Sequence, residues 1–485
     1  MSEEVYKPRS VIIDQIELTN FDKSKTIDIR AMLIALDVYE DMFQSQITGD
    51  ITIEDSLELI QFFPIVGEET LTLRWRIPTV PEDRAIVIKD LRIYKIGDRA
   101  GDGNMSAKSQ KYKLYFMSGE SSTNLNITVS RSFAMKKASD IAKLVYDDYI
   151  KKDKPFEFHE TQGLLRMVIP NWKPFKIMNW LATDKAINTE GLADFIFYES
   201  TNKINGPKYN FKSLSILMKQ PPTFTINFNP QNVAENSPGV DTKIDMVSSA
   251  NNIEGFTFGK TGDVAGNTMN GMYNQSWIIH DPLRKKFVVK KPIHKEDYWK
   301  PSPLGSNRFY TDKLQEETKP LQFFRMPGAV NNFPVEIDAD RGISNNMNKI
   351  AEPRPRRLDF GYIAKRETPL ELQCDSMMRH LYKRAFELQK NNNFIASISS
   401  IPGNDRIQLG GVIEFNKPHL SYNNDMYNEQ SGRLDDRYIS GNFLVTRLSH
   451  NFRATTGDGE TRYTMSLDLM KDNFIEQISH KTIAE

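Results

Sequence analysis

The chain has 485 residues, of which 39% are hydrophobic and 26% are charged. This apolar content is enough for packed cores and too high for a disordered chain, and the length fits about three or four domains of roughly 100–200 residues each. Lys and Arg (63) balance Asp and Glu (63), so the formal net charge is zero. Proteins that hold nucleic acid usually carry a basic excess, because neutralising phosphates supplies much of their affinity. The balance therefore argues against a protein that wraps DNA, and it allows a neutral surface that DNA slides past.

The single cysteine, Cys374, excludes an internal disulfide and a cysteine-based zinc cluster. The seven histidines never stand in HExxH or another tight metal-ligand spacing. Residues 1–9 lack the apolar core of a signal peptide, and no stretch approaches the ~20 apolar residues of a membrane span. We therefore expect a soluble chain that folds in a reducing compartment, with no metal, no cofactor and no membrane span.

Alternation of apolar and polar residues predicts strands from Ser10 to about Asn124. In residues 70–77, Leu71, Leu73 and Trp75 alternate with polar neighbours, which places one strand face in the core and the other in water. The same alternation occurs in residues 27–33, 50–54 and 111–116, and turn residues stand at 22–24 and 97–103. A small barrel would remove the exposed edges of these strands. Residues 1–125 are therefore predicted to form a first antiparallel β-barrel.

The period then changes to helical spacing, which predicts a helix over residues 132–151. A second helix should begin at Pro174, where proline suits the first turn. Strands are expected at residues 195–200 and 210–214. Residues 126–226 are thus predicted to be an α+β middle domain.

Residues 227–485 are predicted to form a second barrel that is interrupted by an insertion. After an Asn-, Pro- and Gly-rich linker at 227–242, residues 227–291 contain strand candidates at 252–258 and 274–279. Residues 292–365 are an irregular insertion, and a loop of that length favours contact with a partner. In residues 366–485, Thr368, Pro369 and Glu371 form a capping box before a helix that ends near Asn391. Strands follow at 394–399, 412–415, 442–452 and 462–469, where residues 463–469 again alternate, with a hairpin turn at 456–459. The predicted fold class is β-rich α+β, with two antiparallel β-barrel-like domains, the middle domain and the insertion.

Several motifs that could carry chemistry have simpler interpretations. Gly259-Lys260-Thr261 resembles the end of a phosphate-binding loop, but Glu254 stands where the first glycine of that motif belongs, which favours a turn between strands. The carboxylates of Glu68 and Glu69 are adjacent, as are those of Asp435 and Asp436, so on a strand each pair points to opposite faces.

The same holds for the histidine and the basic run that stand out in the sequence. His280-Asp281 has no GxSxG sequence to complete a triad, and Asp281-Pro282 fits the start of a turn. The basic run at 353–357 fits a solvated linker or contact with an acidic partner. No residue is therefore assigned a catalytic, cofactor-binding or metal-binding role, and the chain is predicted to be a structural component rather than an enzyme. A lytic, peptidoglycan-degrading enzyme and a host-glycan-binding module remain the alternatives.

Several segments together resemble the baseplate central hub proteins of contractile-tailed phages. Residues 36–41 (LDVYED), 51–56 (ITIEDS) and 63–69 (FPIVGEE) resemble the first barrel of that family, and residues 168–174 (VIPNWKP) resemble the start of its middle α+β domain. Residues 280–286 and the stretch from 441–446 through 469–472 are also similar to it. The similarity touches most of the chain except residues 291–355.

The resemblance implies a homotrimer in which each subunit contributes two similar barrels to a nearly six-fold ring. Such a ring adapts the six-fold tail tube to a three-fold spike and leaves a channel through which DNA passes without specific binding. The VgrG-like hubs of contractile secretion systems follow the same plan with a fused spike. Here no long repetitive β-helix follows Asp472, so a separate spike protein is expected.

The other implied partners are the tail tube or tube-initiator protein, baseplate wedge proteins and the tape measure protein. The implied location is the virion tail baseplate, assembled in the host cytoplasm. In this family the second barrel is built from separated segments, so residues 244–291 should join residues 392–473.

Overall fold

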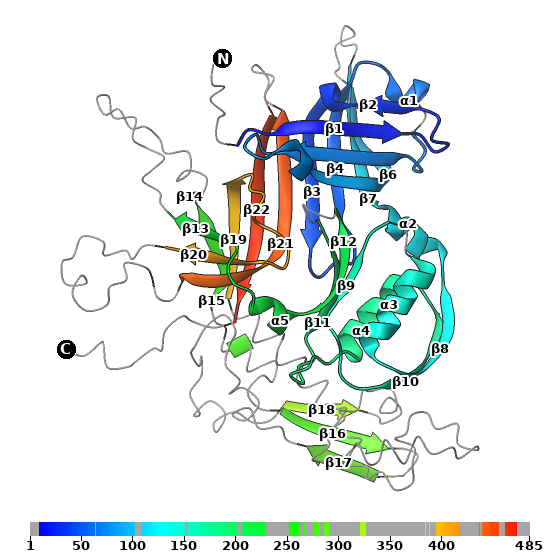
Figure 1. Cartoon of the computed structure of the whole chain (residues 1–485), viewed down its shortest axis with the longest axis vertical. Coiled ribbons are helices and arrows are strands. Elements are labelled where there is room, and N and C mark those ends of the chain that lie inside the picture. Colours follow the sequence, from blue (N-terminus) through cyan, green and yellow to red (C-terminus); the bar gives the residue numbers. More distant parts are fainter. Residues whose placement is uncertain are drawn as a thin grey trace, which may run out of the picture.

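The structure is a computed structural model (Figure 1). It describes residues 9–63, 65–101, 109–150, 153–201, 206–228, 252–253, 255–261, 263, 265–266, 275–281, 286–290, 321–325, 384, 388, 394–417, 436, 439–454 and 461–472.

The first part of the chain is built from strands, as the alternating pattern predicts. Its strands are β1 (Ile12–Thr19), β2 (Thr26–Asp28), β3 (Leu33–Asp41), β4 (Thr48–Asp55), β5 (Thr70–Arg76), β6 (Ile86–Gly101) and β7 (Gln110–Ser118). Two 3-10 turns, η1 (Arg30–Met32) and η2 (Glu82–Arg84), and the short helix α1 (Leu59–Phe62) connect them. Leu71, Leu73 and Trp75 are buried in β5, which confirms the predicted inward face of that strand.

The strand expected at residues 27–33 is wrong in its extent. β2 ends at Asp28, the η1 turn follows, and a separate strand begins at Leu33. The carboxylate of Asp28 accepts a hydrogen bond from the backbone N–H of Arg30 at 3.0 Å. This local hydrogen bond competes with the strand pairing of β2 and turns the chain. The alternation of apolar and polar residues does not indicate such a turn.

An α+β unit follows. Its strands are β8 (Val129–Lys136), β9 (Phe156–Phe158), β10 (Leu165–Trp172), β11 (Phe195–Ser200) and β12 (Lys208–Ser213). Its helices are α2 (Gly119–Asn126), α3 (Ala138–Tyr149), α4 (Pro174–Asp184) and α5 (Leu214–Met218). α4 begins at Pro174 and β11 has the predicted bounds, so both predictions are confirmed.

The helix predicted for residues 132–151 begins too early. Residues 132–136 belong to β8, which pairs antiparallel with β10, and α3 begins at Ala138. Met135, with a left-handed φ of 54°, lies just before this change of direction. The buried side chain of Phe133 suits both a strand and a helix, so the apolar spacing did not separate the two.

The last part of the chain returns to strands: β13 (Phe224–Phe228), β14 (Asn252–Ile253), β15 (Phe256–Thr261), β19 (Phe394–Pro402), β20 (Val412–Asn416), β21 (Gly441–Ala454) and β22 (Thr461–Lys471). A separate small sheet contains β16 (Gln275–Asp281), β17 (Lys286–Lys290) and β18 (Leu321–Arg325). β18 shows that the predicted irregular insertion contains at least one strand.

Other predicted features fall mainly outside the described residues. These are the linker beyond Phe228, most of residues 292–365, the basic run 353–357 and the hairpin turn 456–459. Of the helix expected at 368–391, Arg384 and Leu388 are described, and both are helical. Arg384 donates hydrogen bonds to the carbonyl oxygens of Ala182 and Phe195 at 3.1 and 3.0 Å, which ties this segment to the α+β unit.

Strands from the two ends of the chain form one 14-stranded sheet. The joining ladder is antiparallel between β3 and β21, which lie side by side in Figure 1. Most of the sheet is antiparallel, and β13 pairs in parallel with both β14 and β20. Among the described strands the main path ends at β2 and β14, so the ladders do not close into the two barrels expected from the sequence. Alternation indicates which face of a strand is buried, but not which strand it pairs with.

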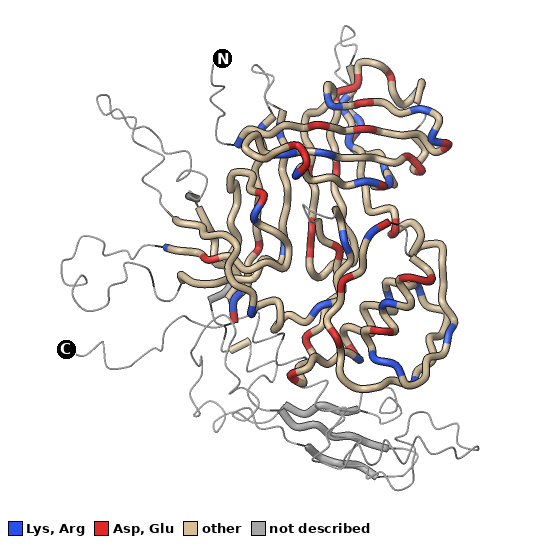
Figure 2. The backbone as a smooth tube through the Cα atoms, viewed as in Figure 1, with Lys and Arg blue, Asp and Glu red and all other residues tan. Residues whose placement is uncertain are grey.

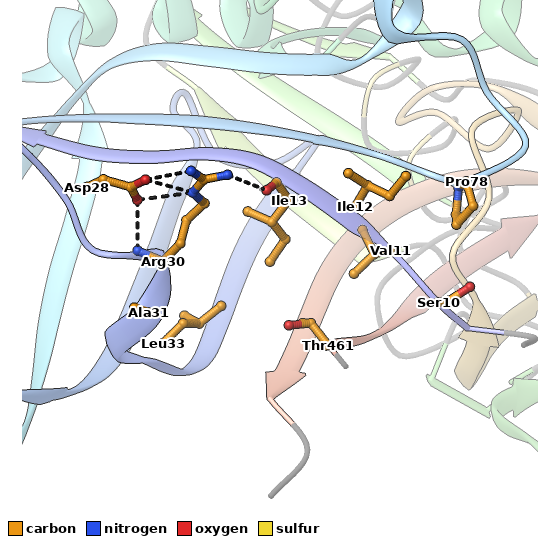
Figure 3. Close-up of a pocket in the computed structure, with 10 residues that line it drawn as sticks. All are labelled: Ser10, Val11, Ile12, Ile13, Asp28, Arg30, Ala31, Leu33, Pro78 and Thr461. Atoms are coloured by element: carbon orange, nitrogen blue, oxygen red, sulfur yellow. Dashed lines mark hydrogen bonds and ion pairs between the residues drawn. The ribbon is translucent and has the colours of Figure 1, made fainter. Parts of the chain in front are cut away.

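The sheet comes nearest to closing where β1 begins beside β22. The backbone N–H of Tyr463 donates to the carbonyl oxygen of Arg9 at 2.8 Å, and Ser10 forms an isolated bridge with Arg462. Beside this bridge lies a cavity of about 650 Å³, lined by apolar side chains such as Leu33 and by Arg30 (Figure 3). The guanidinium of Arg30 is paired within the chain, to the Asp28 carboxylate and the Ile13 carbonyl.

Two hydrophobic cores hold the molecule together. One lies under the large sheet and draws buried residues from both ends of the chain, such as Leu36 and Leu467. The other lies within the α+β unit, between its helices and strands. No helix in the described part of the chain is long and apolar enough to cross a membrane.

Candidate functional site

Four strands from each end of the chain repeat the same arrangement. β3, β4, β6 and β7 are the first to fourth strands of one set in chain order. Across the sheet they lie as β6-β7-β4-β3, which is the order third, fourth, second, first. β15, β19, β21 and β22 lie in that same order, as β21-β22-β19-β15. All ladders within both groups are antiparallel. We call them the first and the second sheet group.

The two sheet groups meet head to tail. The joint pairs β3, the first strand of the first group, with β21, the third strand of the second group. The edges in contact are therefore different, as in a heterologous interface between two copies of one protein. The sheet groups repeat along the sheet as successive units of a ring or a filament do.

Ion pairs cross the joint on its exposed face. Arg453 binds Asp37 through two hydrogen bonds of 2.7 and 2.8 Å, and Arg447 binds Asp41 at 2.8 Å. The charge of Asp41 raises the pKa of Arg447 above its ordinary value. The arginine side chains are more than half exposed, so each pair contributes at most about 1 kcal/mol. Their main effect is to select one register.

The same face continues as a polar surface over the first sheet group. The Nζ of Lys113 on β7 lies 3.1 Å from Asp50 on β4, and the hydroxyl of Tyr39 donates to Asp50 at 3.3 Å. Burial and the nearby charges of Asp37 and Asp50 raise the pKa of Tyr39 to about 12, so the hydroxyl stays protonated. β3 and β4 contain acidic residues and no basic ones, whereas β7 contains lysines and no acidic residue, so opposite charges meet between these strands (Figure 2). We call this surface the polar face.

The opposite face of the joint is buried and contains a chain of hydrogen bonds. His450 on β21 lies between the Tyr463 hydroxyl (2.7 Å) and the Glu40 carboxylate (3.0 Å). Glu40 also accepts hydrogen bonds from the backbone N–H of Thr201 at 2.8 Å and from its hydroxyl. Thr201 follows β11, so these contacts tie together the first group, the second group and the α+β unit.

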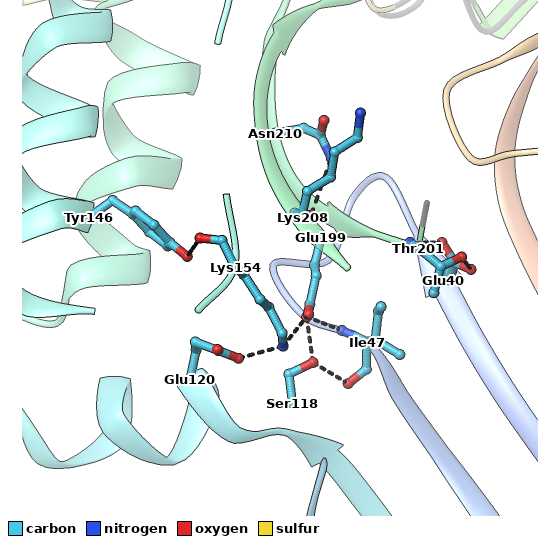
Figure 4. Close-up of polar contacts among 10 residues, drawn as sticks. All are labelled: Glu40, Ile47, Ser118, Glu120, Tyr146, Lys154, Glu199, Thr201, Lys208 and Asn210. Atoms are coloured by element: carbon cyan, nitrogen blue, oxygen red, sulfur yellow. Dashed lines mark hydrogen bonds and ion pairs between the residues drawn. The ribbon is translucent and has the colours of Figure 1, made fainter. Parts of the chain in front are cut away.

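A second buried cluster attaches the α+β unit to the first sheet group (Figure 4). The Nζ of Lys154 lies 2.5 Å from Glu120 and 2.7 Å from Glu199. Glu199 also accepts from the Ser118 hydroxyl at 2.5 Å and from the backbone N–H of Ile47 at 2.8 Å. Burial acts to lower the pKa of Lys154, but the charges of Glu199 and Glu120 outweigh it and raise that pKa. The cluster therefore holds a charged lysine between two carboxylates.

A third buried charge gives a testable pH dependence. Lys471 at the end of β22 is fully buried, its Nζ donates to the Ser440 carbonyl at 3.0 Å, and burial lowers its pKa to about 8. In the unfolded chain its pKa returns to an ordinary value near 10.4. Between these values the unfolded chain binds more protons, so stability rises with pH. Below pH 8 the buried charge costs about 3 kcal/mol.

Lys471→Met should therefore raise the denaturation midpoint at pH 7, and this advantage should shrink between about pH 8 and pH 10. Urea titrations of the variant and the parent chain across this range would measure it. Lys111→Met, which removes an exposed lysine, is the matched control and should give no such trend. An advantage of Lys471→Met that stays constant with pH would contradict the assignment.

The motifs considered for chemistry occupy structural positions. Gly259-Lys260-Thr261 lies within β15 and not in a turn, so that prediction is wrong, because the β15–β19 ladder continues through a bulge. Glu69 is buried, and its carboxylate accepts hydrogen bonds from the backbone N–H groups of Val66 and Gly67, whereas Glu68 is exposed.

Two further candidates are placed in part. Asp436 binds the Nζ of Lys417 at 3.0 Å, and its neighbour Asp435 lies outside the described residues. His280 and Asp281 end β16 and pair with β17. Within the described residues, no three His, Cys, Asp or Glu side chains are placed to hold a metal ion.

The residues that matter most for the joint were missed at the sequence level. Asp37 and Arg453 lie 416 positions apart, and although Asp37 stands in the LDVYED segment, nothing in that segment indicates its partner. The available signal was the polar half of each alternating strand. Lys154 gave no such signal, because a buried lysine is indistinguishable in sequence from a surface one.

No protein-family model and no curated protein matches the sequence. In structure the chain is similar to a tail protein from Neisseria meningitidis MC58, at 10% identity, with coverage of 94% of this chain and 96% of that one and a TM-score of 0.45. It is also similar to the 43 kDa tail protein of prophage MuSo2 from Shewanella oneidensis (8% identity, 95% and 98% coverage, TM-score 0.46). A third match is a Francisella PdpA–VgrG complex (11% identity, 99% and 61% coverage, TM-score 0.43). The structures that this chain resembles are thus tail proteins and a VgrG complex.

Proposed function

We propose that this chain is a structural baseplate central hub of a contractile phage tail. Three copies form a ring of near six-fold character, which adapts a hexameric tail tube to a trimeric spike and leaves a channel for DNA. The proposal assigns the chain no catalytic role. Its neighbours in the particle would be the spike protein, the tail tube or tube-initiator protein, baseplate wedge proteins and the tape measure protein.

The observation that carries the proposal is the repeated strand order of the two sheet groups. Each chain supplies two groups of one topology, already joined head to tail through β3 and β21. Three copies of two groups give six similar units. A three-fold ring built in this way can contact a six-fold neighbour on one side and a three-fold neighbour on the other.

The polar face supports the channel in this proposal. Its carboxylates are neutralised by Lys113, Arg447 and Arg453 across neighbouring strands. These three cations are already paired with carboxylates, and DNA affinity grows with the number of phosphates that a protein neutralises. A channel lined by the polar face would let DNA pass without holding it.

The first test is the mass of the purified chain. Multi-angle light scattering is expected to give a trimer at high concentration or in the presence of the spike protein. A monomer under both conditions would contradict the ring. The chain should also copurify with tube and spike proteins.

The second test is the position of the chain in the assembled particle. Electron cryomicroscopy should place it on the tail axis between the tube and the spike. A lytic enzyme would instead clear peptidoglycan in a zymogram, and a glycan-binding module would bind host glycans away from the axis. Either result without axial density would overturn the proposed function.

A further inference from the structure

The joint between the two sheet groups defines which edges fit each other. It joins residues 35–41 of β3 to residues 447–453 of β21, with Glu40 opposite Leu448 and Tyr39 opposite Ser449. The equivalents of these two edges exist once more in the chain. They are β15 in the second group and the second half of β6 in the first.

The bulges align β6 with β21. Beyond Gly97, β6 has a further bulge before Ala100 that β21 lacks, so the comparison covers residues 95–97. Before that point, β6 and β21 each have one register shift, between Ile93 and Lys95 against β7 and between Val445 and Arg447 against β22. Superposing the two bulges makes Lys95 equivalent to Arg447. Ile96 then becomes the equivalent of Leu448.

The ladders align β15 with β3. Ile51 of β4 lies between Leu36 of β3 and Leu114 of β7, and Ile398 of β19 lies between Phe256 of β15 and Leu467 of β22. This makes Phe256 equivalent to Leu36. One step along each ladder makes Phe258 equivalent to Val38, and beyond the bulge of β15, Thr261 corresponds to Glu40.

Both of these edges lack a strand partner among the described residues. β15 pairs with β19 alone, and β5 pairs with β6 only as far as Arg92. The remaining half of β6, through Gly101, has β7 on one side and no ladder on the other.

The exposure of side chains at the two open edges also indicates that these edges can pair. In the joint, Leu36, Val38 and Leu448 are at most 2% exposed. Their equivalents Phe256, Phe258 and Ile96 are only partly buried. The open edges thus leave accessible the apolar side chains that the internal joint covers, and unpaired strand edges of this kind bind further strands.

We propose that β15 of one copy pairs antiparallel with the second half of β6 in the next copy, in the register of the internal joint over residues 95–97. Thr261 then lies opposite Ile96, and the contact repeats the β3–β21 joint between subunits. This inference rests on the proposed function, because it supplies the intermolecular joints of the ring. The occupant of each edge is a second copy of this chain.

Cysteine cross-linking tests the register. In a Cys374→Ser background, chains carrying Ile96→Cys are mixed with chains carrying Thr261→Cys and then oxidised. Directly opposite residues in an antiparallel pair have Cβ atoms about 4.5–5.5 Å apart, near the range of a disulfide. The mixture should give a cross-linked dimer on a non-reducing gel, each chain alone should not, and a chain with both substitutions should give a covalent trimer.

Lys95→Cys with Thr261→Cys is the matched control, because neighbours on a strand point to opposite faces. Its yield should be about tenfold lower. Equal yields from the Lys95 and Ile96 pairs, or trimers without the Ile96–Thr261 link, would overturn the register and leave the trimeric hub standing. A chain that stays monomeric would overturn both proposals.

Hydrogen exchange gives a second measurement that needs no substitution. Amides of residues 95–101 and 256–261 in the unaltered chain should exchange about tenfold more slowly in the oligomer than in dilute monomer. Amides of exposed α2 residues near Leu125 serve as the reference and should not change. An oligomer in which both edges exchange as fast as in the monomer would also overturn the pairing.

Discussion

Replacing Leu73 with aspartate is expected to lower the free energy of unfolding by about 4 kcal/mol or more. Leu73 is fully buried at the centre of β5, between Ile16 on β1 and Ile88 on β6. The substitution removes an apolar side chain from a packed core and puts a carboxylate there with no partner. Urea denaturation followed by circular dichroism would measure the loss.

Thr72→Asp is the matched control for this prediction. Thr72 is the next residue on β5 and points to the opposite, partly exposed face, near Arg74. Its substitution should cost less than about 1 kcal/mol. Equal losses for the two variants would mean that the faces of β5 are assigned incorrectly.

The second large effect is expected from Lys154→Met. The substitution leaves Glu120 and Glu199 close together in a buried site without the cation between them. Breaking a buried ion pair by removing one partner costs about 3–5 kcal/mol. The loss should be larger at pH 8 than at pH 5, because the folded chain can relieve the repulsion by taking up a proton at low pH. Denaturant titrations at both pH values would measure it.

Lys137→Met tests whether the effect depends on burial. Lys137 pairs with Glu160 at 3.2 Å on the surface, and both side chains are more than a third exposed. This variant should lose at most about 1 kcal/mol. A comparable loss from Lys137→Met, or none from Lys154→Met, would contradict the role assigned to the buried cluster.

The parts of the fold that local sequence determines could be predicted. Alternation over residues 70–77 and 463–469 identified strands and their buried faces, and Pro174 marked the start of α4. The boundary between β8 and α3 was missed, because Phe133 fits the core in either conformation. The division of residues 27–33 depends on one side-chain hydrogen bond, from the Arg30 N–H to Asp28.

The candidate site could not be predicted, because it depends on which strands become neighbours. The expectation of two similar strand-built units agrees with the two sheet groups, but their continuity through β3 and β21 lies beyond any local pattern. The ladder between Arg453 and Ala35 joins residues whose sequence neighbours give no sign of each other. Only the repeated order of strands, read from the structure, makes the edges of β6 and β15 comparable.

The β3–β21 joint also has a consequence for biosynthesis. Glu40 leaves the ribosome early, yet its partner His450 lies 410 positions later. At about 5–20 residues per second, the nascent chain waits roughly 20–80 s before the strand that covers β3 exists. During that interval the unpaired edge of β3 in the nascent chain can bind neighbouring chains on the same polysome. Translation speed and chaperone supply should therefore govern the yield of native protein.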